Sequence, residues 1–175
     1  MFKTEKIRVA FDLDGVIIGK PPLIPGKVLE WFVREQNSKN PRFRYPKFFG
    51  ERWLRWFSHY HSFRPPIKEN FELVKRLSKD KSYELFVISG RYRFLKKRTE
   101  KWFKVHKIDG IFKEVHLNLK NEQPHVFKEK VLKKLKPDIF FEDDELIVNY
   151  LNKKLSRRGT KVCYVEETKD LSDFI

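Results

Sequence analysis

Residues 8–17 have the sequence RVAFDLDGVI, which joins the pattern of a buried strand to a charged strand end. The run is almost continuously apolar until Asp12, and a second carboxylate follows at Asp14. Two acids this close repel each other and raise each other's pKa, unless a cation, a proton or a reaction makes use of them. We therefore expect something to bind between Asp12 and Asp14.

Similar apolar runs recur along the chain and alternate with helical patterns. The predicted strands are IRVAFDL (7–13), YELFVIS (83–89), FKEVHLN (112–118), PDIFFED (137–143) and KVCYVEE (161–167). The spacing of apolar residues also predicts helices at 91–106, 125–135 and 144–157. This alternation is typical of a parallel sheet with right-handed crossovers. We predict an α/β fold, a Rossmann-like parallel sheet of about five strands with flanking helices.

About seventy residues separate the first two predicted strands, which is too many for one crossover helix. Two helical patterns, at 24–36 and 65–80, flank a segment at 41–64 that is dense in aromatic and basic residues. We interpret this insertion as a small helical cap above the carboxyl edge of the sheet. The predicted division is a catalytic core, residues 1–18 and 81–175, and an inserted cap, residues 19–80.

Four polar clusters follow predicted strands or begin the next helix. They are DLDG (12–15), SGR (Ser89, Gly90, Arg91), Lys128 and EDD (142–144). In a parallel sheet the carboxyl ends of the strands lie at one edge, where ligands bind. Carboxylates can hold Mg²⁺, while a hydroxyl and an ammonium group can hold phosphate oxygens. The clusters together suit phosphoryl transfer.

In this order the four clusters resemble the motifs of the haloacid dehalogenase (HAD) superfamily of aspartate-dependent phosphohydrolases. The resemblance covers nearly the whole chain. SGRYRFLKKRTEKWF (89–103) and VFKEKVLKKLKPDIFFEDD (126–144) are also similar to polynucleotide 3′-phosphatase domains and to deoxynucleotidases within the superfamily. The resemblance implies a Mg²⁺-dependent phosphomonoester hydrolase, with a nucleotide or a nucleic-acid terminal phosphate among its candidate substrates.

The resemblance also implies roles for individual residues. Asp12 would attack phosphorus and form an aspartyl-phosphate, and Asp14 would be the general acid and then the general base. The implied phosphate-binding residues are Ser89, Gly90 and Lys128. The implied Mg²⁺ ligands are Asp12, the backbone carbonyl of Asp14, Asp143 and Asp144.

Several alternatives stay open at this point. Asp143 and Asp144 could simply cap a helix, and Ser89 could be a turn residue. Lys120 and Lys130 compete with Lys128, which we prefer because it lies near a helix start. A phosphotransferase or phosphomutase would share the aspartyl-phosphate, and a nucleic-acid-binding module could use a degenerate hydrolase fold.

The formal net charge of +15 indicates anionic partners, of which a phosphorylated substrate and nucleic acid are the candidates. Exposed lysines that only raise solubility are the competing explanation. In the cap, Arg52, Trp53 and Trp56 are candidates for substrate contacts, as is Arg91 beside the pocket. Aromatic and basic residues interleaved in this way suit base stacking with phosphate contacts. Alternatively, the aromatic residues form a core of the cap while its arginines face water.

The N-terminal sequence and the cysteine content bear on the location of the protein and on which cysteine-based sites it can form. The first ten residues, MFKTEKIRVA, carry charges where a signal peptide needs an apolar run, and no stretch reaches the length of a membrane span. We expect a cytoplasmic protein. The single cysteine, Cys163, lies in a predicted core strand, so neither a disulfide framework nor a cysteine zinc site is expected. The sequence does not indicate an oligomeric state.

Overall fold

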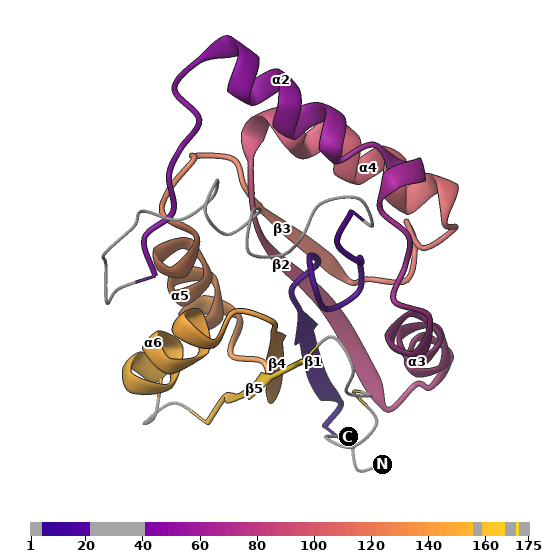
Figure 1. Cartoon of the computed structure of the whole chain (residues 1–175). Coiled ribbons are helices and arrows are strands. Elements are labelled where there is room, and N and C mark those ends of the chain that lie inside the picture. The colour runs from indigo at the N-terminus through magenta and orange to yellow at the C-terminus, as the bar shows by residue number, and fades with distance from the viewer. Residues whose placement is uncertain (1–4, 22–40, 156–158, 167–170, 172–175) are drawn as a thin grey trace.

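A central parallel sheet organises the molecule (Figure 1). The computed structural model describes residues 5–21, 41–155, 159–166 and 171. The strands run in the order β3-β2-β1-β4-β5. They are β1 (Ile7–Phe11), β2 (Tyr83–Tyr92), β3 (Glu114–Asn118), β4 (Ile139–Glu142) and β5 (Lys161–Tyr164). The predicted α/β fold with a five-stranded parallel sheet is confirmed.

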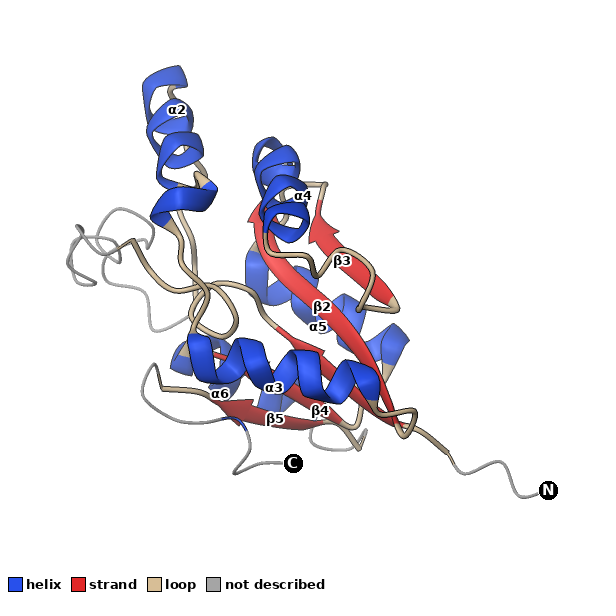
Figure 2. Ribbon diagram, turned by 90° about the vertical axis from the view of Figure 1, so that its right-hand side faces the viewer, coloured by secondary structure: helices blue, strands red, loops and turns tan. Residues whose placement is uncertain are grey.

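Helices cover both faces of this sheet (Figure 2). One face carries α3 (Lys68–Lys79) and α4 (Lys96–Val105), and the other carries α5 (Pro124–Leu135) and α6 (Glu145–Leu155). Successive strand residues alternate between the two: Val9 and Phe11 pack into the core cluster under α3, while Ala10 packs into the cluster under α5 and α6. Strands buried on both faces need apolar residues at every position. This explains the continuous apolar runs.

The register of the strands brings three strand ends to one level. Phe11 of β1 pairs with Val87 of β2 and with Phe141 of β4. The residues that follow these positions therefore meet at the carboxyl edge of the sheet, on either side of the central strand β1. This register places the polar clusters of the sequence side by side.

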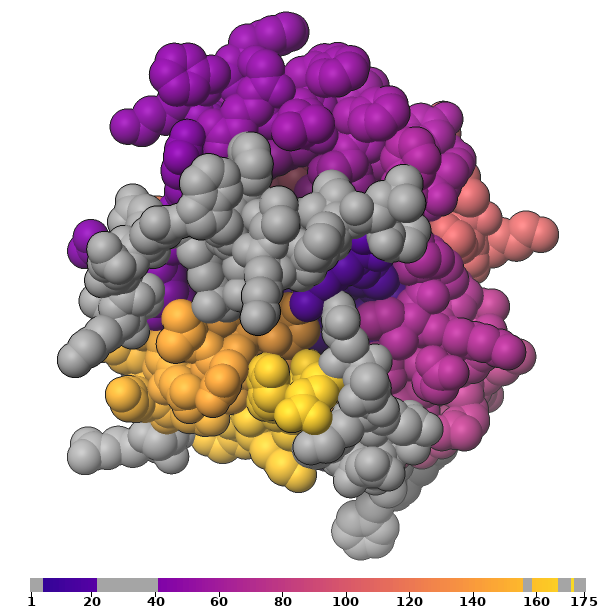
Figure 3. Space-filling model, in the orientation of Figure 1, coloured from indigo at the N-terminus to yellow at the C-terminus, as the bar shows by residue number. Residues whose placement is uncertain are grey.

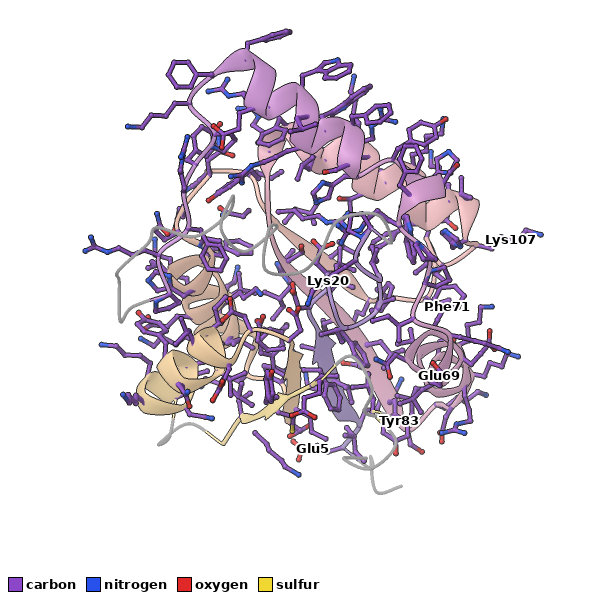
Figure 4. The ribbon with its side chains drawn as sticks, in the orientation of Figure 1. Glu5, Lys20, Glu69, Phe71, Tyr83 and Lys107 are labelled. Atoms are coloured by element: carbon purple, nitrogen blue, oxygen red, sulfur yellow. The ribbon has the colours of Figure 1, made fainter. Side chains whose placement is uncertain are left out.

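The helix α3 packs on the sheet although it falls within the segment predicted as the cap. Its buried apolar residues share one core cluster with β1 and β2: Phe71, Leu73, Val74 and Leu77. Figure 4 labels Phe71 on the side of α3 that faces the rest of the fold. The division into a core and a cap stays a prediction.

Element ends differ from the predicted ones mainly after Ser89. The strand β2 continues to Tyr92, and a short 3₁₀ turn (Arg93–Leu95) precedes α4, so the helix predicted at 91–106 begins at Lys96. Arg91 and Tyr92 are buried, and Tyr92 still pairs with Asn118 of β3 beyond an irregularity in the ladder. Buried contacts here override the helical pattern. The helix predicted at 24–36 lies outside the described residues.

The remaining helix, α2 (Phe49–Ser58), lies at the carboxyl edge, followed by a 3₁₀ turn at His61–Phe63. None of its residues is buried. In the space-filling view, residues 41–64 form the upper rim of the molecule (Figure 3). None of the described helices combines the length and apolarity that crossing a bilayer requires.

Candidate active site at the carboxyl edge of the sheet

The loop after β1 positions the two carboxylates of DLDG. The backbone N–H of Asp12 donates to the carbonyl of Phe141 at 2.9 Å, which extends the ladder with β4 by one residue. The chain then turns, with Gly15 at φ +77° and its N–H donating to Ile18. A Cβ on Gly15 would lie 1.9 Å from Oδ2 of Asp143. Only glycine allows the loop to approach Asp143 so closely.

A buried ammonium group links the ends of β1 and β4. Lys128, from the first turns of α5, is 3% exposed, and its Nζ lies 3.3 Å from Oδ2 of Asp12 and 2.6 Å from Oε2 of Glu142. Burial alone would lower the pKa of Lys128, but the two carboxylates raise it above its usual value. Lys128 therefore stays charged and compensates two buried acids.

One cation does not balance the whole acidic cluster. Oxygens of Asp12, Glu142 and Asp143 lie within 4.8 Å of one another. Burial, reinforced by Asp12, raises the pKa of Asp143 to about 8, and burial also raises the pKa of Asp12 and of Glu142. Lys20, which Figure 4 labels near the carboxyl end of β1, lowers the pKa of Asp143 only in part. The cluster favours either protons or a further cation.

The observed donors fit a hard divalent cation. All three are carboxylates, the ligands that Mg²⁺ prefers, and Oδ1 of Asp12 is buried without a hydrogen-bond partner among the described residues. An unpaired buried carboxylate oxygen is costly unless an ion or a donor meets it. These residues could hold a metal ion.

The carboxylate of Asp14 has different neighbours from that of Asp12. Nε and one terminal nitrogen of Arg91 donate to its two oxygens at 2.7 and 2.6 Å, and Arg64 donates to the same carboxylate. Burial would raise the pKa of Asp14, but the guanidinium groups of Arg91 and Arg64 hold it well below its usual range. The Asp14 side chain is 32% exposed, so solvent reaches it.

The SGR segment lies against the start of α5. Ser89 is buried, and its Oγ accepts the backbone N–H of Arg91 at 3.3 Å. A Cβ on Gly90 would lie 2.8 Å from Cβ of Pro124, so this glycine lets β2 and α5 approach closely. Arg91 also donates to Thr99 of α4 at 2.9 Å. The segment therefore positions Arg91 toward Asp14.

Two predicted site residues, Asp144 and Lys128, had alternatives in the sequence analysis. The carboxylate of Asp144 accepts the N–H groups of Leu146 and Ile147 at 3.0 and 3.3 Å, as a helix-capping residue does. Of the competing lysines, Lys130 is paired with Glu122 at 2.5 Å, and Lys120 is exposed on the loop after β3. The roles of Asp144 and Lys128 stay predictions, and Lys128 is the lysine that reaches Asp12.

The three residues predicted to contact substrate from the cap, Arg52, Trp53 and Trp56, differ in their contacts within the protein. The guanidinium carbon of Arg98, on α4, lies 3.3 Å from the ring centre of Trp56, so Trp56 joins α2 to α4. Trp53 is 55% exposed and stacks on Phe57 within α2. The Nε of Arg52 donates to the carbonyl of Pro46 at 3.2 Å. The aromatic residues of α2 thus do not form a buried core.

Sequence reasoning missed two residues of the site, Arg64 and Glu142. Arg64, at the end of the segment 41–64, is 3% exposed and reaches Asp14, and Glu142 pairs with Lys128. The carbonyl of Arg64 accepts Nε1–H of Trp102 at 2.7 Å. Glu142 belongs to the EDD cluster, and its position as the last residue of the strand could have indicated that it faces the site. Arg64 had none beyond its charge.

Comparisons with known proteins identify this fold. No protein-family model matches the chain, and no curated protein matches it at a significant level. A HAD family enzyme from Bacteroides thetaiotaomicron, solved with magnesium and inorganic phosphate, is similar with a TM-score of 0.60 and 14% identity over 97% of this chain and 98% of that one. The HAD-like hydrolase SP0104 from Streptococcus pneumoniae is similar with a TM-score of 0.56 and 15% identity, over 97% of this chain and 90% of that one.

A chain of the Pnkp1/Rnl/Hen1 RNA repair complex is similar with a TM-score of 0.54 and 13% identity over 95% of this chain. The chain spans 44% of that relative's length. Identities this low establish the fold alone. The chain has the HAD fold, as its motifs indicated.

Proposed function

We propose that this chain is a Mg²⁺-dependent phosphomonoester hydrolase that forms an aspartyl-phosphate on Asp12. The observation that carries the proposal is the buried Asp12 carboxylate, which lies 3.3 Å from Nζ of Lys128 and within 4.8 Å of carboxylate oxygens of Glu142 and Asp143. The HAD fold of the chain supports it, as does the order of the polar clusters at the strand ends.

Asp12 would attack phosphorus, forming an oxygen–phosphorus bond as the bond to the leaving oxygen breaks. Lys128 would hold a phosphoryl oxygen and keep the nucleophile beside the anionic phosphate. The N–H groups and hydroxyl of the Ser89–Gly90 segment would hold other oxygens. Water then attacks the aspartyl-phosphate, releases inorganic phosphate and restores the Asp12 carboxylate.

The metal would be held by Asp12 and Asp143, with Glu142 beside them. The backbone carbonyl of Asp14 and the side chain of Asp144 are the further predicted ligands. When bound, the ion supplies positive charge that offsets the repulsion between these carboxylates and the substrate phosphate. The raised pKa of Asp143 supports this assignment, because a cation would take the place of the proton.

Asp14 would move the protons of both steps. It would give a proton to the leaving oxygen and later accept one from the attacking water. Its ion pairs with Arg91 and Arg64 keep it ionised but also weaken it as a base while both pairs persist. To act as the acid it needs those guanidinium groups drawn toward a bound phosphate. Arg64 and Arg91 would then contact substrate oxygens in the loaded site.

A nucleotide or the terminal phosphate of a nucleic acid is the proposed substrate. The net charge of +15 favours polyanionic ligands. The fold is shared with a chain of an RNA repair complex, which supports a nucleic-acid context.

A panel of phosphomonoesters tests the proposed function. It would contain p-nitrophenyl phosphate, nucleoside monophosphates and oligonucleotides phosphorylated at the 3′ or 5′ end. We expect phosphate release with Mg²⁺, none in excess EDTA, and recovery when Mg²⁺ is restored. Undiminished turnover in EDTA would contradict the metal dependence. Phosphate transfer to added alcohols in preference to water would favour a phosphotransferase instead.

A further inference from the structure

The helix α2 has its amphipathic faces reversed relative to an ordinary surface helix. The charged side chains Glu51 and Arg55 are only 9% and 12% exposed and face the protein. The opposite side presents large apolar side chains to solvent, with exposures of 84% for Phe49, 55% for Trp53 and 44% for Phe57. A patch of this kind on a described surface indicates a binding site.

Polar contacts fix which face of α2 points outward. Arg55 donates to the carbonyl of Arg44 at 3.1 Å and to Glu51 at 3.2 Å. Trp56, which is still 39% exposed, contacts the guanidinium group of Arg98 on α4, and Arg98 also covers the ring of Tyr60. The outward face is therefore set by contacts among the described residues, and its large side chains are exposed.

The exposed face consists of rings rather than aliphatic chains. Six of its members are aromatic and one is aliphatic: Phe48, Phe49, Trp53, Trp56, Phe57, Phe63 and Leu54. Trp53 and Phe57 stack at 5.6 Å with an angle of 12° between their planes, and Phe57 lies 5.3 Å from Phe63. Rings project from α2 along the top of Figure 4. We call the seven residues the α2 aromatic face.

The charged residues of the segment that carries this face are almost all basic. Residues 41–64 contain one acid, Glu51, whose carboxylate is paired with Arg55. Their six basic residues are Arg42, Arg44, Lys47, Arg52, Arg55 and Arg64. Four of them are exposed: Arg42, Arg44, Lys47 and Arg52. A polyanion that carries rings of its own matches both the charge and the aromatic surface.

The same segment leads into the candidate active site. It ends at Arg64, whose guanidinium group contacts Asp14. We propose that the α2 aromatic face binds single-stranded nucleic acid, with bases stacked on Trp53 and its neighbours and phosphates near Lys47 and Arg52. The strand's terminal phosphate would lie in the pocket, a part of the proposal that rests on the proposed function.

Binding can be tested apart from catalysis. The probes are fluorescein-labelled dT12 and rU12, with and without a terminal phosphate, titrated against the Asp12→Asn protein in EDTA. We expect binding that weakens steeply with salt. Trp53→Ala should weaken it about fivefold or more, since one stacked base is worth about 1–3 kcal/mol. The DNA and RNA arms decide which strand is preferred.

Two matched comparisons separate stacking from other causes. Trp53→Tyr keeps a ring and should retain most affinity, whereas Trp53→Leu keeps an apolar side chain and should lose it. Lys47→Gln should lower the affinity and the salt slope, whereas Lys79→Gln removes another exposed charge, on α3, and should change neither. An unchanged melting temperature in the Trp53 variants would confirm that the fold is intact.

Defined outcomes would overturn the proposal. They are equal affinity in Trp53→Leu and the wild type, equal losses in Lys47→Gln and Lys79→Gln, or no oligonucleotide binding at low salt. Binding to phosphatidylserine vesicles without oligonucleotide binding would assign the face to a membrane instead. Concentration-dependent dimers lost in Trp53→Ala, without oligonucleotide binding, would assign it to a second copy. Hydrolysis of p-nitrophenyl phosphate would still report separately on the proposed function.

Discussion

Lys128 and the acids around it determine the electrostatics of the candidate site. Its Nζ lies between Asp12 and Glu142, and all three side chains are almost fully buried. Removing one partner of a buried ion pair leaves an uncompensated charge, which typically costs about 3–5 kcal/mol. The same ammonium group is the proposed ligand of the phosphoryl oxygens. Stability and activity should therefore depend on it together.

We predict that Lys128→Met lowers the free energy of unfolding by about 3 kcal/mol in EDTA and abolishes hydrolysis of p-nitrophenyl phosphate. Lys130→Met is the matched control, because Lys130 is on the same helix but exposed, and it is paired with Glu122. It should change stability by less than about 1 kcal/mol. Urea unfolding and steady-state rates measure both. Loss of activity in Lys130→Met with full activity in Lys128→Met would refute the assignment.

The acidic cluster predicts how the stability of the metal-free protein changes with pH. The pKa of Asp143 is raised to about 8, whereas an unfolded aspartate titrates near pH 4. Between these values the folded state holds a proton that the unfolded state has lost, so stability falls as pH rises. Asp12 and Glu142 act in the same direction.

In EDTA, we expect the free energy of unfolding to fall by about 1 kcal/mol between pH 7 and pH 8, above the range in which histidines titrate. Asp143→Asn should reduce this slope. Urea unfolding at several pH values measures it. A stability that rises over the same interval, with no difference in Asp143→Asn, would show that the cluster is not neutralised by protons.

At the scale of elements, the turn after β1 determines whether Asp143 can approach the site. Gly15 and Gly159 both have positive φ, +77° and +80°. A Cβ on Gly15 would overlap the Asp143 carboxylate, whereas a Cβ on Gly159 would meet no heavy atom within 4 Å. Substitution of either glycine would therefore strain the backbone, but only substitution of Gly15 would also cause a clash.

Gly159→Ala should cost about 1–2 kcal/mol, the usual strain of a left-handed residue, and keep full activity. Gly15→Ala should cost more and abolish Mg²⁺-dependent turnover, because the Asp143 carboxylate must move. Melting temperatures and rates of the two variants measure this difference. Equal activity in both variants would contradict the placement of Asp143 in the site.

The elements show what the sequence could predict. Strand positions followed from apolar runs because both faces of the sheet are buried, and the shared carboxyl edge followed from parallel topology. The pairing of Glu142 with Lys128 could not be predicted, because charge alone does not determine which acid a buried lysine contacts. The sequence left open whether the aromatic residues of the cap form a binding surface or a core, because an amphipathic pattern gives two faces without saying which one is buried.

At the scale of the whole molecule, a strongly basic chain carries an acidic cluster at the carboxyl edge of its sheet. The net charge of +15 attracts anions to the molecule, while Asp12, Glu142 and Asp143 would repel them when ionised. Protons relieve this repulsion in the metal-free protein, and under the proposed function Mg²⁺ takes their place. The central claim is that Asp12 then carries the phosphoryl group during turnover.

Acid quenching during turnover with Mg²⁺ and p-nitrophenyl phosphate, followed by peptide mass spectrometry, tests this claim most directly. We predict a phosphoryl group on the peptide that contains Asp12. It should be absent in EDTA and in Asp12→Asn, which should fold normally by circular dichroism and be inactive. Turnover by Asp12→Asn at the wild-type rate, or a phosphoryl group on a different residue, would contradict the account.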